Sequence, residues 1–125
     1  MQIPGLVPSL WMLLGSPGVA SGQVPAYTFR GDESASNFGF AVSGAGDVDG
    51  DGYADLIVGA NNDGSGGYGS GMAQVFAGID GSLLQTFFGP SSDDVFGYSV
   101  SGAGDVDGDG LDDVIIGAVQ DTGGP

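Results

Sequence analysis

Two nine-residue segments, 47–55 and 105–113, place aspartates at positions 1, 3, 5 and 9. A calcium ion takes six to eight oxygen ligands at about 2.3–2.6 Å, and aspartates on a tight turn can supply most of them together with the backbone carbonyl at position 7. Glycines at positions 4 and 6 of each segment allow such a turn. We therefore expect two calcium sites. Their ligands are Asp47, Asp49, Asp51, the Tyr53 carbonyl and Asp55 in the first, and Asp105, Asp107, Asp109, the Leu111 carbonyl and Asp113 in the second.

Other interpretations of the acidic segments fit less well. Magnesium demands a tighter octahedral shell and gives up water reluctantly. A turn rich in aspartate that binds nothing is the plain alternative, but here the whole pattern occurs twice. An EF-hand would need an acid at position 12, where Val58 and Ile116 stand in apolar runs. The extra acid Asp112 has Ala54 as its counterpart, so we expect it to point to solvent.

The duplication extends well beyond the acids. Residues 38–59 and 96–117 align without a gap and are identical at 16 of 22 positions. A weaker copy lies at the same offset, where Thr28-Phe29-Arg30-Gly31 matches Thr86-Phe87-Phe88-Gly89. Self-similarity at a fixed period of this size is typical of repeat architectures.

Composition favours an all-β chain that binds hard cations. The 125 residues contain 27 glycines, no cysteine and no histidine, and 16 acids against one base give a net charge of −15. Disulfides, thiolate sites and histidine-ligated zinc are excluded, which leaves oxygen ligands. Nucleic acid and anionic membranes are poor partners because both require a basic patch.

Seven stretches have the pattern of strands, with approximate bounds 24–30, 37–43, 54–60, 72–78, 82–88, 95–101 and 112–118. Asp80-Gly81 predicts an antiparallel hairpin between the fourth and fifth. The apolar runs 56–58 and 114–116 predict strands buried on both faces. The composition of the glycine-rich stretch 61–71 favours a flexible connection, with a ligand-contacting loop as the alternative.

The first 22 residues differ from the rest. Leu6 to Leu14 is apolar but too short to cross a bilayer, and small residues follow at 18–21. We interpret residues 1–22 as a possible signal peptide, although no base precedes the apolar run and prolines interrupt it. A degenerate repeat is the alternative, and we expect no transmembrane segment.

These features resemble the repeat of integrin α-subunit β-propellers, called the FG-GAP repeat, and more closely its bacterial versions. The resemblance rests on Phe38-Gly39 and Phe96-Gly97, the two complete Asp-x-Asp-x-Asp-Gly-x-x-Asp motifs, and the later Gly59-Ala60 and Gly117-Ala118, with the family's proline missing. It implies a partial β-propeller of about two four-stranded antiparallel blades, with the same ten calcium ligands in the hairpins. Residues 23–35 would then be the outer strand of a preceding blade, 36–89 the first repeat blade, and 90–125 a second, truncated blade.

The function that follows is that of a non-enzymatic, calcium-binding propeller segment, extracellular or at the cell surface. It would serve adhesion to a protein or glycan, with calcium as a structural staple and further blades supplied by a longer chain or a homo-oligomer. The alternative is an accessory or catalytic propeller of a secreted polysaccharide hydrolase or lyase. We expect no catalysis, because most nucleophile and base pairs need the histidine, cysteine or lysine that this chain lacks.

Overall fold

The computed structural model describes residues 9–13, 25–31 and 36–119. Its strands are β1 (Ser9–Leu13), β2 (Pro25–Arg30), β3 (Phe38–Gly46), β4 (Asp55–Ala60), β5 (Met72–Phe76), β6 (Leu83–Phe88), β7 (Ser99–Gly104) and β8 (Asp113–Gly117). The described residues contain no helix. All seven predicted strands are present, while β1 lies in a segment that the sequence did not predict to be a strand.

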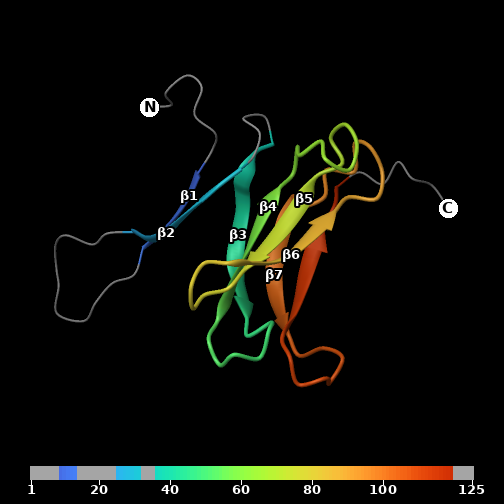
Figure 1. The fold of residues 1–125 in the computed structure, drawn as a ribbon. Helices are drawn as coiled ribbons and strands as arrows, with labels where there is room; N and C mark the ends of the chain where they lie inside the picture. Colours follow the sequence, from blue (N-terminus) through green and yellow to red (C-terminus); the bar gives the residue numbers. More distant parts are fainter. Residues whose placement is uncertain (1–8, 14–24, 32–35, 120–125) are drawn as a thin grey trace.

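The strands form three antiparallel sheets, which follow one another along the chain (Figure 1). The central sheet has four strands in the order β3-β4-β5-β6, β1 pairs with β2, and β7 pairs with β8. A four-stranded antiparallel meander is the form of a propeller blade. The fold is therefore all-β and consistent with partial propeller blades, as predicted.

The two repeats share one strand register. Val42 pairs with Val58 in the central sheet, and Val100 pairs with Ile116 in the next. Each hairpin also has a bulge just before its acidic loop, between Gly44 and Gly46 and at the equivalent place in β7. Pairing through the bulge extends β3 and β7 about three residues beyond their predicted ends.

The predicted hairpin at Asp80-Gly81 is confirmed. β5 and β6 pair antiparallel, and the turn is closed by a hydrogen bond from the Ala77 N–H to the Ser82 carbonyl at 2.8 Å. Gly81 has φ +77°, a conformation that glycine adopts without a steric penalty.

The Phe-Gly dipeptide fixes the start of each repeat. Phe38 is buried in the core, and Gly97 has φ +85°. A Cβ at Gly97 would overlap the Met72 carbonyl of the preceding sheet, so only glycine allows this close approach. Phe96 donates its N–H to Ser70 at 3.0 Å, which explains why β7 begins at Ser99 and not at 95.

Each face of the central sheet packs against a neighbouring sheet. On one face the ring of Phe29 from β2 lies 4.3 Å from that of Phe76, and Phe38 meets the same ring edge-on. On the other face the buried side chains of Ala45, Ile57, Ala73 and Val75 pack against Val48, Leu84, Phe87, Phe96, Val100, Val114 and Ile116. The second group includes β7 and β8, so the two repeats share one core.

The prediction that both apolar runs are interior holds for only one of them. Ile57 and Val58 are fully buried in β4, but Ile115 in β8 is 62% exposed. The physical reason is that β4 lies between β3 and β5 with a sheet on each face. Within the described residues β8 pairs with β7 alone and is covered on one face.

The glycine-rich stretch 61–71 is hydrogen-bonded to the segment 89–97. The N–H groups of Asp93, Val95 and Phe96 donate to the carbonyls of residues 68, 69 and 70 at 2.9–3.1 Å. Ser70 is buried, whereas Tyr68 is exposed. The stretch therefore joins the two repeats and is not the free connection that its composition favours.

Candidate metal sites

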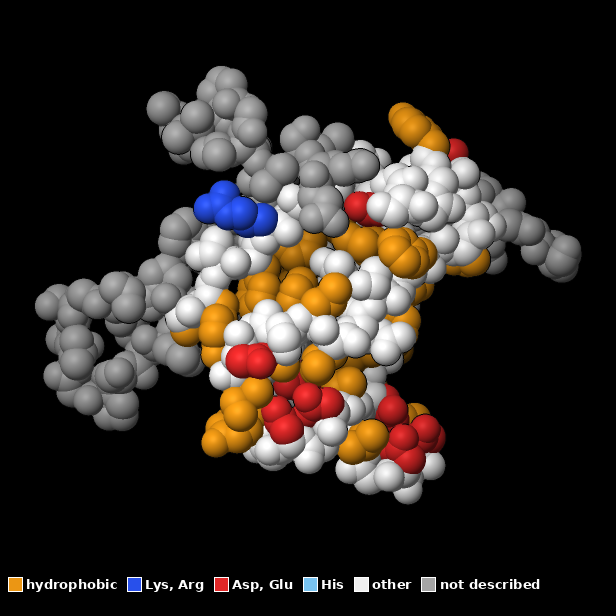
Figure 2. All heavy atoms as spheres, viewed as in Figure 1, with side chains coloured by type: hydrophobic (Ala, Val, Ile, Leu, Met, Phe, Trp, Pro, Cys, Tyr) orange, Lys and Arg blue, Asp and Glu red, His pale blue; other side chains and the backbone are white. Residues whose placement is uncertain are grey.

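The two acidic loops lie at the same end of the molecule, where β3 turns into β4 and β7 turns into β8 (Figure 1). Figure 2 shows two groups of acidic side chains at this end and Arg30, the chain's one basic residue, well away from them. Within the described residues no lysine or arginine therefore neutralises the loops.

The first aspartate of each loop organises the turn. The carboxylate of Asp47 accepts the N–H groups of Gly50, Asp51 and Gly52 at 2.8–3.0 Å. Asp105 accepts the equivalent three, from Gly108, Asp109 and Gly110, at 2.8–3.1 Å. The backbone thus curls around the first carboxylate in the same way in both repeats.

The third and fifth positions continue this pattern. Asp49 accepts the N–H of Asp51 at 3.1 Å, and Asp51 accepts that of Tyr53 at 2.8 Å. In the second loop Asp107 accepts the N–H of Asp109 at 3.0 Å, and Asp109 accepts that of Leu111 at 2.9 Å. Each carboxylate uses its Oδ1 in these bonds.

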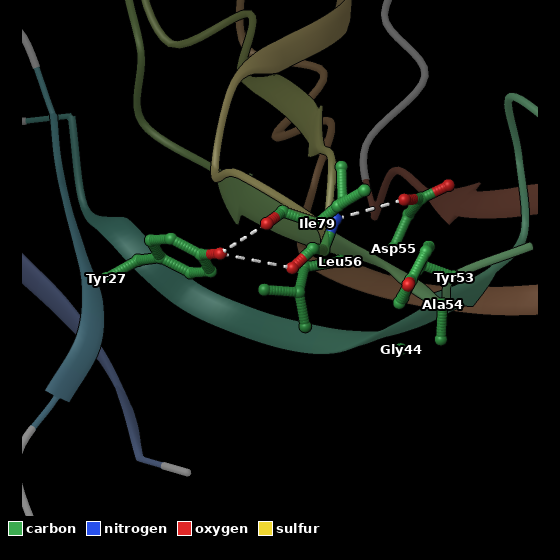
Figure 3. Close-up of a pocket in the computed structure, with 8 residues that line it drawn as sticks. Tyr27, Gly44, Tyr53, Ala54, Asp55, Leu56 and Ile79 are labelled. Atoms are coloured by element: carbon green, nitrogen blue, oxygen red, sulfur yellow. Dashed lines mark hydrogen bonds between the residues drawn. The ribbon is translucent and has the colours of Figure 1, made fainter. Parts of the chain in front are cut away.

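The ninth position closes each loop, but in different surroundings. Asp55 is 1% exposed and accepts the N–H groups of Val48 at 2.8 Å and Gly78 at 3.0 Å. Figure 3 shows it beside a pocket of about 520 Å³, across which the Tyr27 hydroxyl reaches the Ile79 carbonyl at 2.8 Å. Asp113 accepts the N–H of Val106 at 2.7 Å and is only half-buried.

Three of the four aspartates in each loop converge on one point. Carboxylate oxygens of Asp47, Asp49 and Asp55 all lie within 4.8 Å of one another, as do those of Asp105, Asp107 and Asp113. Oxygens that each stand about 2.3–2.6 Å from one calcium ion can be at most about 5 Å apart, so both groups fit that ion. Asp51 and Asp109 lie outside these groups, and Tyr53 and Leu111 would contribute only backbone carbonyls.

The pKa values reflect the crowding of like charges. Partial desolvation, together with the charges of Asp51 and Asp55, raises the pKa of Asp49. At Asp107 the hydrogen bond from the Asp109 N–H lowers the pKa, but desolvation and the charges of Asp109 and Asp113 outweigh it, so the pKa is raised. In contrast, the N–H of Gly110, with those of Gly108 and Asp109, lowers the pKa of Asp105. The charged forms of Asp49 and Asp107 are thus disfavoured by their neighbours, and a divalent cation would relieve this repulsion.

Asp112 was expected to point to solvent, but in the structure it contacts the first loop. Its carboxylate accepts the N–H of Asp47 at 2.8 Å, and its own N–H donates to the Asp47 carbonyl at 3.0 Å. The sequence showed that position 8 differs between the repeats, with Ala54 in the first, but the partner lies 65 residues away. Sequence reasoning also missed Gly78, whose N–H holds Asp55 from the turn between β5 and β6.

A family model matches the chain in two places. The model is the FG-GAP repeat, and it matches residues 38–76 and 96–124, which together are more than half of the chain. The chain belongs to the FG-GAP repeat family. Each match begins at a Phe-Gly dipeptide and includes one acidic loop.

Curated relatives are integrin alpha subunits. Integrin alpha pat-2 of Caenorhabditis elegans is 35% identical over 114 residues, covering 86% of this chain and 9% of that protein. Integrin alpha-IIb of Homo sapiens is 33% identical over 99 residues, 75% of this chain and 9% of that protein. Integrin alpha-6 of Gallus gallus is 35% identical over 97 residues, 70% of this chain and 8% of that protein. The chain thus spans less than a tenth of the length of these relatives. In the part that the structure describes, no helix is long and apolar enough to cross a membrane.

Proposed function

We propose that this FG-GAP segment is a non-enzymatic, calcium-stabilised part of a β-propeller that works outside the cytoplasm, in adhesion to a protein or glycan. The observation that carries the calcium assignment is the pair of matched carboxylate groups, each gathered within 4.8 Å. Their ligands would be the side chains of Asp47, Asp49, Asp51 and Asp55 with the Tyr53 carbonyl, and those of Asp105, Asp107, Asp109 and Asp113 with the Leu111 carbonyl. The likeness to integrin alpha subunits supports the location and the adhesive role.

Calcium would act here as a structural element. Each loop gathers several carboxylates that repel one another, and an ion bound only by the folded loop stabilises the fold by mass action. At about 1 mM calcium and a dissociation constant of about 10⁻⁴–10⁻³ M, each ion would contribute about 0.4–1.4 kcal/mol.

Calorimetry and thermal melting test this assignment. We expect two ions per chain, a lower melting temperature with chelator and recovery with calcium. Asp49→Asn and Asp107→Asn should each remove one ion. Asp80→Asn is the matched control, because Asp80 lies in the turn between β5 and β6 and accepts local hydrogen bonds from Ser82, whose N–H lies at 2.9 Å. A melting temperature that does not change when chelator is added, or the loss of a bound ion in Asp80→Asn, would contradict the calcium assignment.

We further propose that the outer face of the β7–β8 hairpin packs against another FG-GAP repeat, from a longer chain or a second copy. Its exposed apolar residues Ala103, Val106 and Ile115 are the register counterparts of Ala45, Val48 and Ile57. In the first repeat those positions lie in the core shared with β7 and β8. Light scattering after size exclusion tests for the second copy: a monomer at all concentrations would rule it out and leave the longer chain.

A further inference from the structure

The two acidic loops touch each other, although they belong to different repeats. Asp112 and Asp47 exchange a pair of hydrogen bonds at 2.8 and 3.0 Å. The loops are also close at a second point, because a Cβ at Gly50 of the first loop would come within 2.9 Å of the Leu111 side chain. Residues 111–112 of the second loop therefore form a direct link to the first.

One end of this link is a proposed calcium ligand, and the other end is next to two of them. Asp47 is the first proposed ligand of loop 1 (residues 47–55), and its carboxylate is the acceptor around which that turn is built. Asp112 stands between Leu111 and Asp113, two proposed ligands of loop 2 (residues 105–113). An ion that fixes residues 111–113 would thereby also fix the carboxylate that holds the Asp47 backbone.

Backbone geometry at Gly46 shows that this contact is built closely. Gly46 has φ +75°, and a Cβ there would overlap the Asp112 carboxylate. Its counterpart Gly104 has φ +71°, but a Cβ there would meet nothing within 4 Å. The same repeat position is thus open in the second repeat and filled by Asp112 in the first.

We propose that Asp112 is a positioning residue for loop 1 that couples the two calcium sites, so that an ion in loop 2 raises the affinity of loop 1. The proposal rests on the proposed calcium binding. By linkage the effect is reciprocal, and an ion in loop 1 raises the affinity of loop 2 by the same factor. Only the second of these two repeats can supply such a link, because Ala54, at the same position in the first repeat, has no carboxylate.

Terbium luminescence can report on loop 1 alone. Terbium replaces calcium at oxygen sites and emits when an adjacent tyrosine is excited. Position 7 is Tyr53 in loop 1 and Leu111 in loop 2. The sensitised signal from the full chain is therefore expected to measure loop 1, and its loss in Asp49→Asn, which disables loop 1, verifies this.

The experiment compares loop 1 affinity in four chains: the natural chain, Asp107→Asn, Asp112→Ala and the double variant. Disabling loop 2 by Asp107→Asn should weaken terbium binding at loop 1 about 5-fold, the low end for coupled sites, because the linking bonds are partly exposed. Asp112→Ala alone should weaken it similarly, and adding Asp107→Asn should then change nothing more. Asp112→Asn, which keeps an acceptor oxygen, should restore most of the coupling.

Two controls separate coupling from a loss of fold. A purely structural role of Asp112 would lower the melting temperature of the ion-free chain but leave the effect of Asp107→Asn on loop 1 intact, which would overturn the proposal. Gly46→Ala should weaken loop 1 more than Gly104→Ala, since both are strained at positive φ but only Gly46 faces Asp112. If the natural chain bound no ion at either loop, the calcium assignment itself would fail. If both loops bound and Asp112→Ala left loop 1 unchanged, only the coupling would fail.

Discussion

Ile57 and Ile115 occupy the same position of the two repeats and form a matched pair for testing how the repeats pack. Ile57 is fully buried between the central sheet and the β7–β8 hairpin, whereas Ile115 is 62% exposed on the far side of that hairpin. The strands carrying them have the same register. Changing each isoleucine to alanine therefore removes the same atoms from the same repeat position, and the two sites differ in burial and in whether the strand is central (β4) or paired on one side only (β8).

The expected losses follow from burial. Ile57→Ala removes three buried carbons, worth about 2.4 kcal/mol at about 0.8 kcal/mol each, and the cavity left behind raises the cost to about 3–4 kcal/mol. Ile115→Ala removes the same atoms from a side chain that is only about two fifths buried, which costs about 0.9 kcal/mol and leaves no cavity. The difference of about 2 kcal/mol or more corresponds to roughly 6–12 °C in melting temperature for a domain of this size.

Urea and thermal unfolding, followed by far-ultraviolet circular dichroism in excess calcium, would measure the stability of both variants. The protein concentration would be varied upward from a value at which the chain is monomeric. Equal losses at every concentration would refute the packing argument, since they would mean that the two faces are equally covered or equally open. A loss for Ile115→Ala that grows with concentration would instead identify the β7–β8 face as covered by a second copy.

Two further predictions concern the loops without calcium. Asp55→Ala should cost about 2–4 kcal/mol in urea unfolding, because it leaves the N–H groups of Val48 and Gly78 without their acceptor, whereas the half-exposed counterpart Asp113→Ala should cost about 1 kcal/mol. On acidification, Asp49 and Asp107 should bind protons before Asp105 does, because the pKa values of the first two are raised and that of Asp105 is lowered. The lowered folded pKa of Asp105 means that its contribution to stability is present above the unfolded pKa and is lost as pH falls through the folded one. Carboxyl carbon NMR titration would follow each group, and Asp105 titrating before Asp49 would contradict the proposed order.

Much of this architecture could be predicted from the sequence because the information is local and repeated. The resemblance to the FG-GAP repeat implied hairpins at the acidic segments, and the constant offset of 58 residues indicated that the second would copy the first. Asp80-Gly81 predicted a hairpin turn, and Gly81 adopts its positive φ without a steric penalty. The spacing also brought together three of the four aspartates of each loop, although the grouping does not include Asp51 or Asp109.

The errors share one physical cause, which is that burial and long-range contacts depend on neighbours. The run at 114–116 is as apolar as that at 56–58, but its exposure depends on a sheet that the run does not encode. Asp112 looked like a solvent-facing substitution because its partner lies in another repeat. The stretch 61–71 was predicted to be a flexible connection because its hydrogen bonds to the segment 89–97 are made by backbone groups, which composition does not reveal.

The same nine-residue pattern thus produces two loops with different physical properties. Loop 1 has its closing acid buried and its first backbone N–H held by Asp112, whereas loop 2 has its closing acid half-buried and its Val106 72% exposed. Every contact that distinguishes loop 1 comes either from its own turn between β5 and β6 or from the repeat that follows. Because pre-organised ligands lose less entropy on binding, a repeat that is followed by another should hold its ion more tightly than the last one in the series. The second repeat would then do more than cover an apolar face of the first, since Asp112 would also complete loop 1.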